Sequence, residues 1–347
     1  MLALSDTEYL AANGIIVGAC LFTIFICGLA FTIIAKTVHL RSTTFGDICS
    51  VQMVSDILLI LLNTVWCIVK AFHIHDEAQS RYELLVGVVS KTFYFFTCKL
   101  HVLMAINRYI FIFHATENPK TSSVFRGAIF LCFLLAFLQS FAGPLLDPNL
   151  FVVFSSDSLR WKFATTEWTP FYEAYLEYYL VLTECSIIII LDSASFKKLR
   201  QIHRKVSIHR DSTIAVSKSA NAREMRLLLQ SFCQLIPLSS VMVFFFFVAP
   251  KCDSSFLTFL SSTAAWHFGI SLDGVIIVLF QAKFRSKPQP KPTPSYDDLH
   301  RPVVGRCNSA LHFYFVSCDP FIELRIITIT NLKLLPEQCL VKSQQPE

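Results

Sequence analysis

The sequence carries little charge and few of the motifs that mark soluble enzymes or metal-binding domains. Only 16% of its 347 residues are charged, against roughly 25% in ordinary globular chains, while 54% are hydrophobic. It has no CxxC pair, no HExxH string, no nucleophile elbow and no phosphate-binding loop. We therefore expect no enzyme, no metal site and no cofactor, and we interpret most of the twelve cysteines as small buried apolar side chains.

Signals for secretion and glycosylation are missing as well. The chain contains no Asn-x-Ser/Thr sequon. Near its N-terminus it carries Asp6 and Glu8, where a cleavable signal peptide has basic residues. We therefore expect the first apolar segment to stay in the protein.

Long apolar segments take the place of these motifs. A helix needs about 20 mostly apolar residues to cross a bilayer, and its backbone groups must all be hydrogen-bonded internally. Seven segments meet this requirement, at residues 14–35, 48–69, 84–106, 127–146, 174–195, 227–249 and 256–280. The sequence therefore predicts an all-α membrane protein, a bundle of seven transmembrane helices within residues 14–285.

The basic residues orient this bundle. Loops after the first, third and fifth segments hold 14 Lys and Arg residues, against five in the loops on the other side. Basic loops stay in the cytoplasm, so residues 1–13 are predicted outside the cell and the C-terminus inside. The net charge of +5 is then explained by the basic loops on the cytoplasmic side of the lipid bilayer. We expect no nucleic-acid partner.

Residues 286–347 differ in character from the apolar segments. They begin with the string KPQPKPTP, which is typical of an extended Pro-rich linker. The later stretch 311–335 is moderately apolar, but an eighth transmembrane helix there would have to bury Asp319, Glu323 and other charges. We predict a cytoplasmic tail with little packed structure.

Four ionisable residues fall deep inside predicted helices: Asp56, Lys99, Glu184 and Asp273. Each costs about 2.5–3.5 kcal/mol to insert, so such residues mark polar sites in the bundle. A helix rises 1.5 Å per residue, and counting residues from the outer end of each segment places the four at similar depths in the membrane. We predict that Lys99 pairs with Asp56, Asp273 or both; the alternative is a Lys99 that lines a wet cavity without a fixed partner.

A candidate ligand pocket lies in the outer third of the bundle. Lys91 and Glu177 supply opposite charges there, and Glu177 shares a helix face with Glu184 because the two are seven residues apart. Six aromatic or histidine residues complete the candidate set: Trp66, Phe93, Tyr94, Tyr178, Phe245 and His267. For each aromatic residue, packing between helices is the alternative explanation.

The inner end of the third segment carries the string Asn107-Arg108-Tyr109. Rhodopsin-like receptors have an acidic residue, an arginine and an aromatic residue at this place. The alternative is an arginine that merely reaches the membrane interface from a helix end. Within the sixth segment, Pro237 lacks a backbone N–H, so we predict a kink there that acts as a hinge.

Further short motifs occur at defined places along the segments. They are Thr44-Phe45-Gly46, Trp161-Lys162-Phe163, Ala222-Arg223-Glu224-Met225, Gln230, Gln234, Trp266, Asp273-Gly274, Phe280-Gln281 and Phe284-Arg285. In their order and spacing they resemble the nematode chemosensory serpentine receptors, most closely class x, over residues 14–285. The chain departs from that pattern where the first segment lacks an Asn and where Gln281 replaces the usual Asn.

The resemblance implies a G-protein-coupled receptor with a chemosensory role, a small-molecule ligand, a heterotrimeric G protein as partner, and a place in the plasma membrane, including sensory cilia. Coupling would then fall to Asn107, Arg108, Tyr109, Glu224, Pro237 and the basic stretch 197–226. In such receptors helix six holds the arginine in the inactive state. The alternative from another class is a ligand-gated channel or transporter with seven spans.

Many such receptors also link the top of helix three to the second outer loop by a disulfide bond. The outer loop at residues 147–172 contains no cysteine, and Cys98 lies deep in the third segment. We therefore expect no such bond, and an outer loop held only by packing.

Overall fold

The computed structural model describes residues 4–72, 79–114, 120–155, 159–208 and 214–282. The chain divides into two units, Met1–Lys287 and Pro288–Glu347. All described residues belong to the first unit. The predictions for the Pro-rich linker and for the stretch 311–335 lie outside the described residues.

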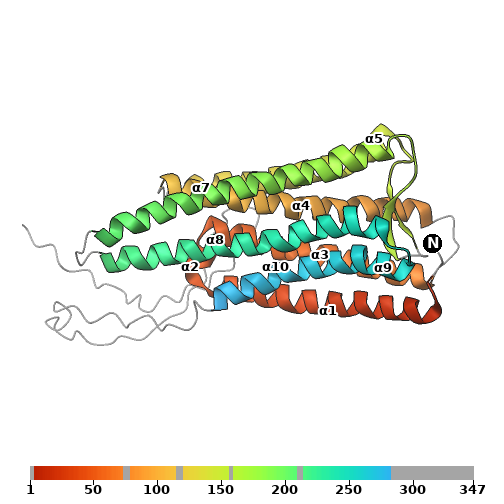
Figure 1. Cartoon of the computed structure of the whole chain (residues 1–347), viewed down its shortest axis with the longest axis horizontal. Helices are drawn as coiled ribbons and strands as arrows, with labels where there is room; N and C mark the ends of the chain where they lie inside the picture. The colour runs from red at the N-terminus through yellow and green to blue at the C-terminus, as the bar shows by residue number, and fades with distance from the viewer. Residues whose placement is uncertain (1–3, 73–78, 115–119, 156–158, 209–213, 283–347) are drawn as a thin grey trace, which may run out of the picture. The chain divides into compact units, whose positions relative to one another are not determined.

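Long helices that lie side by side make up the first unit (Figure 1). In chain order the α-helices of the first four spans and their connection are α1 (Asp6–Lys36), α2 (Val38–Arg41), α3 (Thr44–Phe72), α4 (Gln79–His114) and α5 (Lys120–Leu146). The main helices of the last three are α7 (Leu180–Ile208), α8 (Ile214–Val243) and α10 (Ala265–Ala282). Within the described residues seven spans are long and apolar enough to cross a membrane, so the predicted seven-span, all-α fold is confirmed.

The helices extend beyond the apolar segments that predicted them. The third span was expected at residues 84–106, whereas α4 runs for 36 residues from Gln79 to His114. At the start of α1, Ser5 and Glu8 form a capping box that begins the helix before its apolar part. Hydropathy detects only the length that lipid covers, so boundaries predicted from it fall inside the real helices.

Three spans depart from regular α-helix at the same end of the bundle. The fifth begins with α6 (Thr169–Phe171) and the π-helical η1 (Tyr172–Tyr179). The sixth ends in the π-helical η2 (Phe244–Val248) and the 3₁₀ turn η3 (Ala249–Lys251). The seventh begins with α9 (Ser255–Phe259) and the π-helical η4 (Leu260–Ala264). Segments of π-helix are rare and frequently occur at functional sites.

Helix α4 lies at the centre of the bundle and packs against α3, α5 and α7. Its side chains Phe95, Leu100 and Met104 are almost completely buried in the main hydrophobic cluster. Helix α5, in contrast, exposes large apolar side chains such as Phe130 and Leu131. An exposed apolar face of this kind fits a helix that borders lipid.

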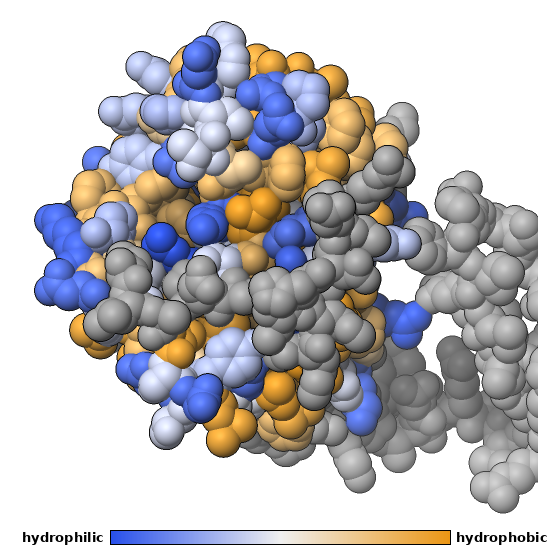
Figure 2. Space-filling model, turned by 90° about the vertical axis from the view of Figure 1, so that its right-hand side faces the viewer, coloured by the Kyte–Doolittle hydropathy of each residue, from blue (hydrophilic) through white to orange (hydrophobic). Residues whose placement is uncertain are grey.

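A two-stranded hairpin crosses one end of the bundle, which we call the hairpin end. Strands β1 (Val152–Ser155) and β2 (Arg160–Phe163) are antiparallel, with Val152 opposite Phe163. The hairpin approaches α4 closely at Gly87, where an added Cβ would lie 2.6 Å from the Val152 carbonyl oxygen. Figure 2 shows hydrophilic side chains among hydrophobic ones on this end of the bundle.

Hydrogen bonds, as well as packing, hold this hairpin. The Phe154 N–H donates to Glu83 Oε1 at 2.7 Å, and the other oxygen of Glu83 lies 3.1 Å from Lys70 Nζ. From the seventh span, Thr263 Oγ1 donates to the Leu159 carbonyl oxygen at 2.8 Å. The expectation of a loop held only by packing is therefore wrong, because a carboxylate at the start of α4 satisfies a strand N–H.

Candidate functional site

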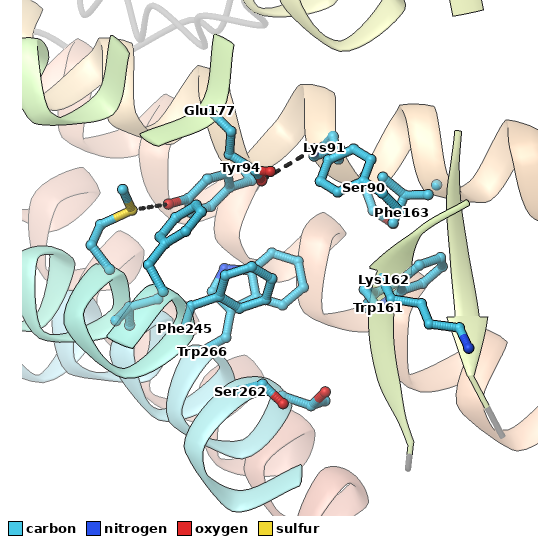
Figure 3. A pocket seen from close by; sticks show the side chains of 16 residues that line it. Ser90, Lys91, Tyr94, Trp161, Lys162, Phe163, Glu177, Phe245, Ser262 and Trp266 are labelled. Carbon is cyan, nitrogen blue, oxygen red and sulfur yellow. Dashed lines mark hydrogen bonds and ion pairs between the residues drawn. The ribbon is translucent and has the colours of Figure 1, made fainter. Parts of the chain in front are cut away.

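A cavity of about 70 Å³ lies beneath the hairpin, between α4 and the fifth, sixth and seventh spans (Figure 3). Ser90, Lys91 and Tyr94 line it from α4, and Trp161 and Phe163 line it from β2. Its surface is mostly apolar with a few polar groups. Apolar walls with a few placed polar groups are the usual composition of a small-molecule site.

All three π-helical segments contribute to the wall of this cavity. Glu177 comes from η1, Phe245 and Phe246 from η2, and Ser262 and Thr263 from η4. The extra residue in each π-helical turn changes the direction of the side chains relative to a regular helix. The irregular stretches of the three spans therefore coincide with the candidate binding site.

An ion pair between Lys91 and Glu177 forms the polar part of the cavity. Lys91 Nζ lies 3.1 Å from Glu177 Oε1, and both side chains are about nine-tenths buried. Three aromatic rings surround the ammonium group: its distance to the ring centre is 3.8 Å for Phe163, 4.9 Å for Tyr172 and 5.5 Å for Phe95. Cation–π attraction and one carboxylate thus compensate a buried positive charge.

Of the eight residues assigned to the pocket from the sequence, the structure places Lys91, Tyr94, Glu177 and Phe245 on the cavity. The Tyr94 hydroxyl also donates to Met242 Sδ at 3.4 Å, which links α4 to the sixth span.

The other four residues pack elsewhere. Trp66 is buried in a cluster with the hairpin, and Phe93 packs against a separate cluster that includes Leu59. The ring of Tyr178 contacts Phe246 and Phe247. His267 is buried with Nδ1 2.7 Å from the Thr263 carbonyl oxygen. A pocket assigned by depth alone includes such neighbours, because adjacent helical residues point about 100° apart.

Several cavity residues were missing from that assignment. Trp266 lines the cavity beside the expected His267, and Trp161 and Phe163 reach it from the hairpin. These three residues did belong to the family motifs, which was the available signal. No strand was predicted in the outer loop, so nothing placed its aromatic residues above the cavity.

Lys99 takes part in a different network from the predicted one. Its Nζ lies 2.8 Å from Glu184 Oε1 and 2.6 Å from Gln139 Oε1. Gln139 in turn donates from Nε2 to the Leu176 carbonyl oxygen at 2.7 Å. The network joins α4, α5 and the fifth span, so the predicted pairing of Lys99 with the acids of the second and seventh spans is wrong.

Those acids, Asp56 and Asp273, meet another face of α4. Thr97 Oγ1 donates to Asp56 Oδ1 at 3.0 Å. Asp273 Oδ2 lies 3.1 Å from His101 Nε2 and accepts from Gln52 Nε2 at 3.1 Å. All five side chains are buried, so this second polar cluster joins α3, α4 and α10.

Rotation around α4 explains why the two networks are separate. Residues 97 and 101 are four apart and share a face. Lys99 is two residues from each and points about 160° away, because successive residues turn by about 100°. Depth places Lys99 level with all the acids, but direction around the helix decides its partner.

At the opposite end of α4, Arg108 is clamped between two other spans. Its Nη2 lies 3.1 Å from Asp192 Oδ1, and its Nε lies 3.3 Å from the same oxygen. Nη2 also contacts the Ser231 hydroxyl, which donates to Asp192 Oδ2 at 2.7 Å. Arg108 and Asp192 are almost completely buried. We call these three side chains the arginine clamp.

The clamp differs from the expected contact with helix six alone. Ser231 does lie on α8, in the sixth span, but the charged partner Asp192 comes from α7, in the fifth. Asp192 was not singled out in the sequence, although a buried arginine requires a carboxylate and Asp192 lies near the inner end of the predicted fifth segment. Asn107, beside Arg108, accepts from Thr44 Oγ1 at 2.7 Å.

The remaining predicted coupling residues lie in α4 and α8. Tyr109 stacks on Phe113, with ring centres 4.3 Å apart. Pro237 lies inside α8, six residues before its end at Val243. Glu224 also lies in α8, but its side chain is outside the described residues. The hinge function of Pro237 stays a prediction.

Comparison with known proteins accounts for this architecture. The family model for the serpentine type 7TM GPCR chemoreceptor Srx matches residues 19–281. Among solved structures, squid rhodopsin has a similar fold, with a TM-score of 0.63, 15% sequence identity, and coverage of 82% of this chain and 85% of that chain. No curated protein matches the sequence significantly. Because the family model spans well over half of the chain, the protein belongs to the Srx family of serpentine seven-transmembrane G-protein-coupled chemoreceptors.

Proposed function

We propose that this receptor binds a small molecule in the cavity beneath the hairpin and activates a heterotrimeric G protein when the arginine clamp opens. In this proposal the protein lies in the plasma membrane, including that of sensory cilia, with its N-terminus outside and its C-terminus in the cytoplasm. The hairpin end is then the outer end. Arg108, Tyr109 and the basic stretch 197–226 face the G protein.

The arginine clamp is the observation that carries this proposal. It joins α4, α7 and α8 through one buried guanidinium group and one buried carboxylate. Any movement of α8 away from α4 removes Ser231 from Arg108 and weakens the clamp. A buried, doubly hydrogen-bonded ion pair has two discrete arrangements, closed or open, which suits a switch between two populations.

Helix α8 also supplies a physical link between cavity and clamp. Val241 lines the cavity, and Ser231, ten residues earlier, belongs to the clamp. At 1.5 Å per residue the two lie about 15 Å apart along the helix axis. Between them, Pro237 removes one helical hydrogen bond and favours bending there. A ligand that displaces the cavity end of α8 would thereby move the clamp end.

The direct test is substitution of Asp192 by Asn in receptors reconstituted with a G protein. Loss of the carboxylate charge weakens the closed clamp, so basal nucleotide exchange should rise. A change of about 1.4 kcal/mol shifts a two-state equilibrium tenfold, and we expect an increase of about that size. The matched control is Asp253→Asn, at an exposed position in the loop before α9.

Substitution of Arg108 by Ala, with surface expression intact, should abolish the response. Unchanged basal exchange in Asp192→Asn together with full signalling in Arg108→Ala would reject the clamp as the switch. An epitope tag at the N-terminus, detected on unpermeabilised cells, tests the proposed orientation and the plasma-membrane location together.

A further inference from the structure

The cavity contains more free hydrogen-bond donors than acceptors. Ser90 Oγ, Lys91 Nζ and Trp161 Nε1 are buried and make no hydrogen bond of good geometry with atoms of the described residues. Besides the three aromatic rings, the partner of Lys91 Nζ among the described residues is Glu177, in the 3.1 Å ion pair. On the acceptor side, the unpartnered atoms among the described lining residues are Glu177 Oε2 and Ser90 Oγ, whose hydroxyl can also accept. Buried polar groups are normally satisfied, so these atoms point to a ligand that supplies acceptors.

The hydroxyl groups of the other lining residues are already engaged. The Thr263 hydroxyl donates to the Leu159 carbonyl oxygen, and the Ser262 hydroxyl donates to the Thr258 carbonyl oxygen. The Tyr94 hydroxyl donates to Met242 Sδ. The free donors are therefore a small defined set.

The charged groups of the cavity and the aromatic rings around them bear on the class of ligand as well. The described lining contains two positive residues, Lys91 and Lys162, and one negative residue, Glu177. Figure 3 shows the Lys162 amino group directed away from the other two, and its side chain is exposed. Because Lys162 points away, Lys91 and Glu177 balance each other inside the cavity, and net charge alone does not distinguish a carboxylate from an amine. The aromatic rings that would attract an ammonium group are already occupied by Lys91.

We infer that the ligand is a small, mostly apolar molecule with a carboxylate, and that this carboxylate binds the free donors of Lys91. Ser90 and Trp161 supply neutral donors beside it, and Lys91 keeps its contact with Glu177. The aromatic walls at Phe245 and Trp266 take the apolar part. This inference rests on the proposed function, because it assigns the ligand class of the same cavity.

The cavity volume limits the size of the ligand. A buried water needs about 10–15 Å³ of such space, so 70 Å³ holds about five to seven water-sized groups. Butanoate and pentanoate, with about six and about seven non-hydrogen atoms, are therefore suitable probes. Butan-1-ol and butylamine have similar apolar parts but present a neutral or a positive head group.

The experiment measures binding and signalling with the same probes. Binding is measured as the rise in thermal unfolding temperature of the purified full-length receptor, and signalling as nucleotide exchange on a reconstituted G protein. We expect the two acids to stabilise and activate the receptor at concentrations at least tenfold below those needed for the alcohol or the amine. A charge-assisted hydrogen bond accounts for a difference of this size.

Matched variants assign this preference to Lys91. Lys91→Met should weaken acid binding at least tenfold and leave alcohol binding within about threefold, whereas Lys91→Arg should retain the acid preference. Glu177→Gln should retain or strengthen acid binding, because it removes the negative charge beside the bound carboxylate. Lys251→Met, at an exposed position outside the cavity, should change nothing.

The outcomes separate this inference from the proposed function. Preference for butylamine, acid binding retained by Lys91→Met, or no binding of either acid to folded receptor would each overturn the carboxylate assignment. Basal exchange in Asp192→Asn reports coupling without any ligand. If that variant signals while no acid binds, the receptor function stands and the ligand class is wrong. If acids bind through Lys91 but no variant couples, the ligand class stands and the switch proposal fails.

Discussion

Two lysine–glutamate pairs connect α4 to the fifth span, and they differ in what surrounds them. Lys91 Nζ lies 3.1 Å from Glu177 Oε1, and Lys99 Nζ lies 2.8 Å from Glu184 Oε1. The exposed fractions of the four side chains are nearly equal, between 9% and 12%. Burial therefore does not distinguish the pairs; hydrogen bonding and the neighbouring space do.

The two pairs differ in their lysines, since one oxygen of each glutamate is unpartnered among the described residues. Lys99 donates to both Glu184 and Gln139, and Gln139 is itself anchored on a carbonyl oxygen of the fifth span. Lys91 makes no well-formed hydrogen bond and borders the cavity. We infer that the Lys99–Glu184 pair stabilises the helix arrangement, while the Lys91–Glu177 pair keeps donors available to a ligand.

Substitution of each lysine should give the largest difference in stability between the two pairs. Lys99→Met leaves Glu184 buried without its partner, and loss of one member of a buried pair costs about 3–5 kcal/mol. Lys91→Met should cost roughly half as much, because water entering the cavity can hydrate Glu177. Thermal unfolding of the two purified variants, measured side by side without ligand, gives the difference.

A double variant serves as the control. Lys99→Met combined with Glu184→Leu replaces the pair by apolar side chains, which often restores stability. It should recover most of the loss caused by Lys99→Met. Equal losses from the two lysine substitutions would contradict the distinction between a structural pair and a binding pair.

The same pairs show which features could be predicted from the sequence and which could not. Apolar length predicted all seven spans, and the spacing of Glu177 and Glu184 placed them on one face of the fifth span. The partner of Lys99 was predicted wrongly, because depth was compared without direction around the helix. The Asp192 contact and the hairpin were not predicted. The Asp192 contact joins residues far apart in the chain, and the four-residue strands of the hairpin have no strong local signal.

Gln139→Leu should make the Lys99 pair resemble the Lys91 pair. The substitution removes one hydrogen bond from the ammonium group, together with the bond from Gln139 Nε2 to the Leu176 carbonyl oxygen, but leaves the ion pair with Glu184 in place. Hydrogen bonds to charged groups contribute about 1.5–3 kcal/mol, so a loss within that range is expected in thermal unfolding. Signalling should persist, since the cavity and the clamp do not include residue 139.

The neighbouring substitution Ser140→Ala controls for general disturbance of α5. Ser140 is buried but hydrogen-bonds only to its own helix, at the Ala136 carbonyl oxygen. It should cost much less than Gln139→Leu. Similar losses would mean that Gln139 contributes by packing and not through Lys99.

The smallest expected effect comes from Glu83, which holds the hairpin over the Lys91 pair. Glu83→Gln keeps an acceptor for the Phe154 N–H but removes the charge that faces Lys70. We expect a loss of about 0.5–1.5 kcal/mol, too small to unfold the receptor. Hydrogen exchange at the Phe154 amide should become up to about tenfold faster, since 1.4 kcal/mol corresponds to a factor of ten.

The informative result for Glu83→Gln is which backbone amides exchange faster. Because the hairpin lies at the cavity end of the bundle, faster exchange should extend along β1 and β2 and leave the helix amides around Lys99 unchanged. Glu167→Gln, at an exposed position after the hairpin, is the matched control. Exchange that accelerates equally around both lysine pairs would show one cooperative unit, and the separation of a binding end from a structural centre would then be lost.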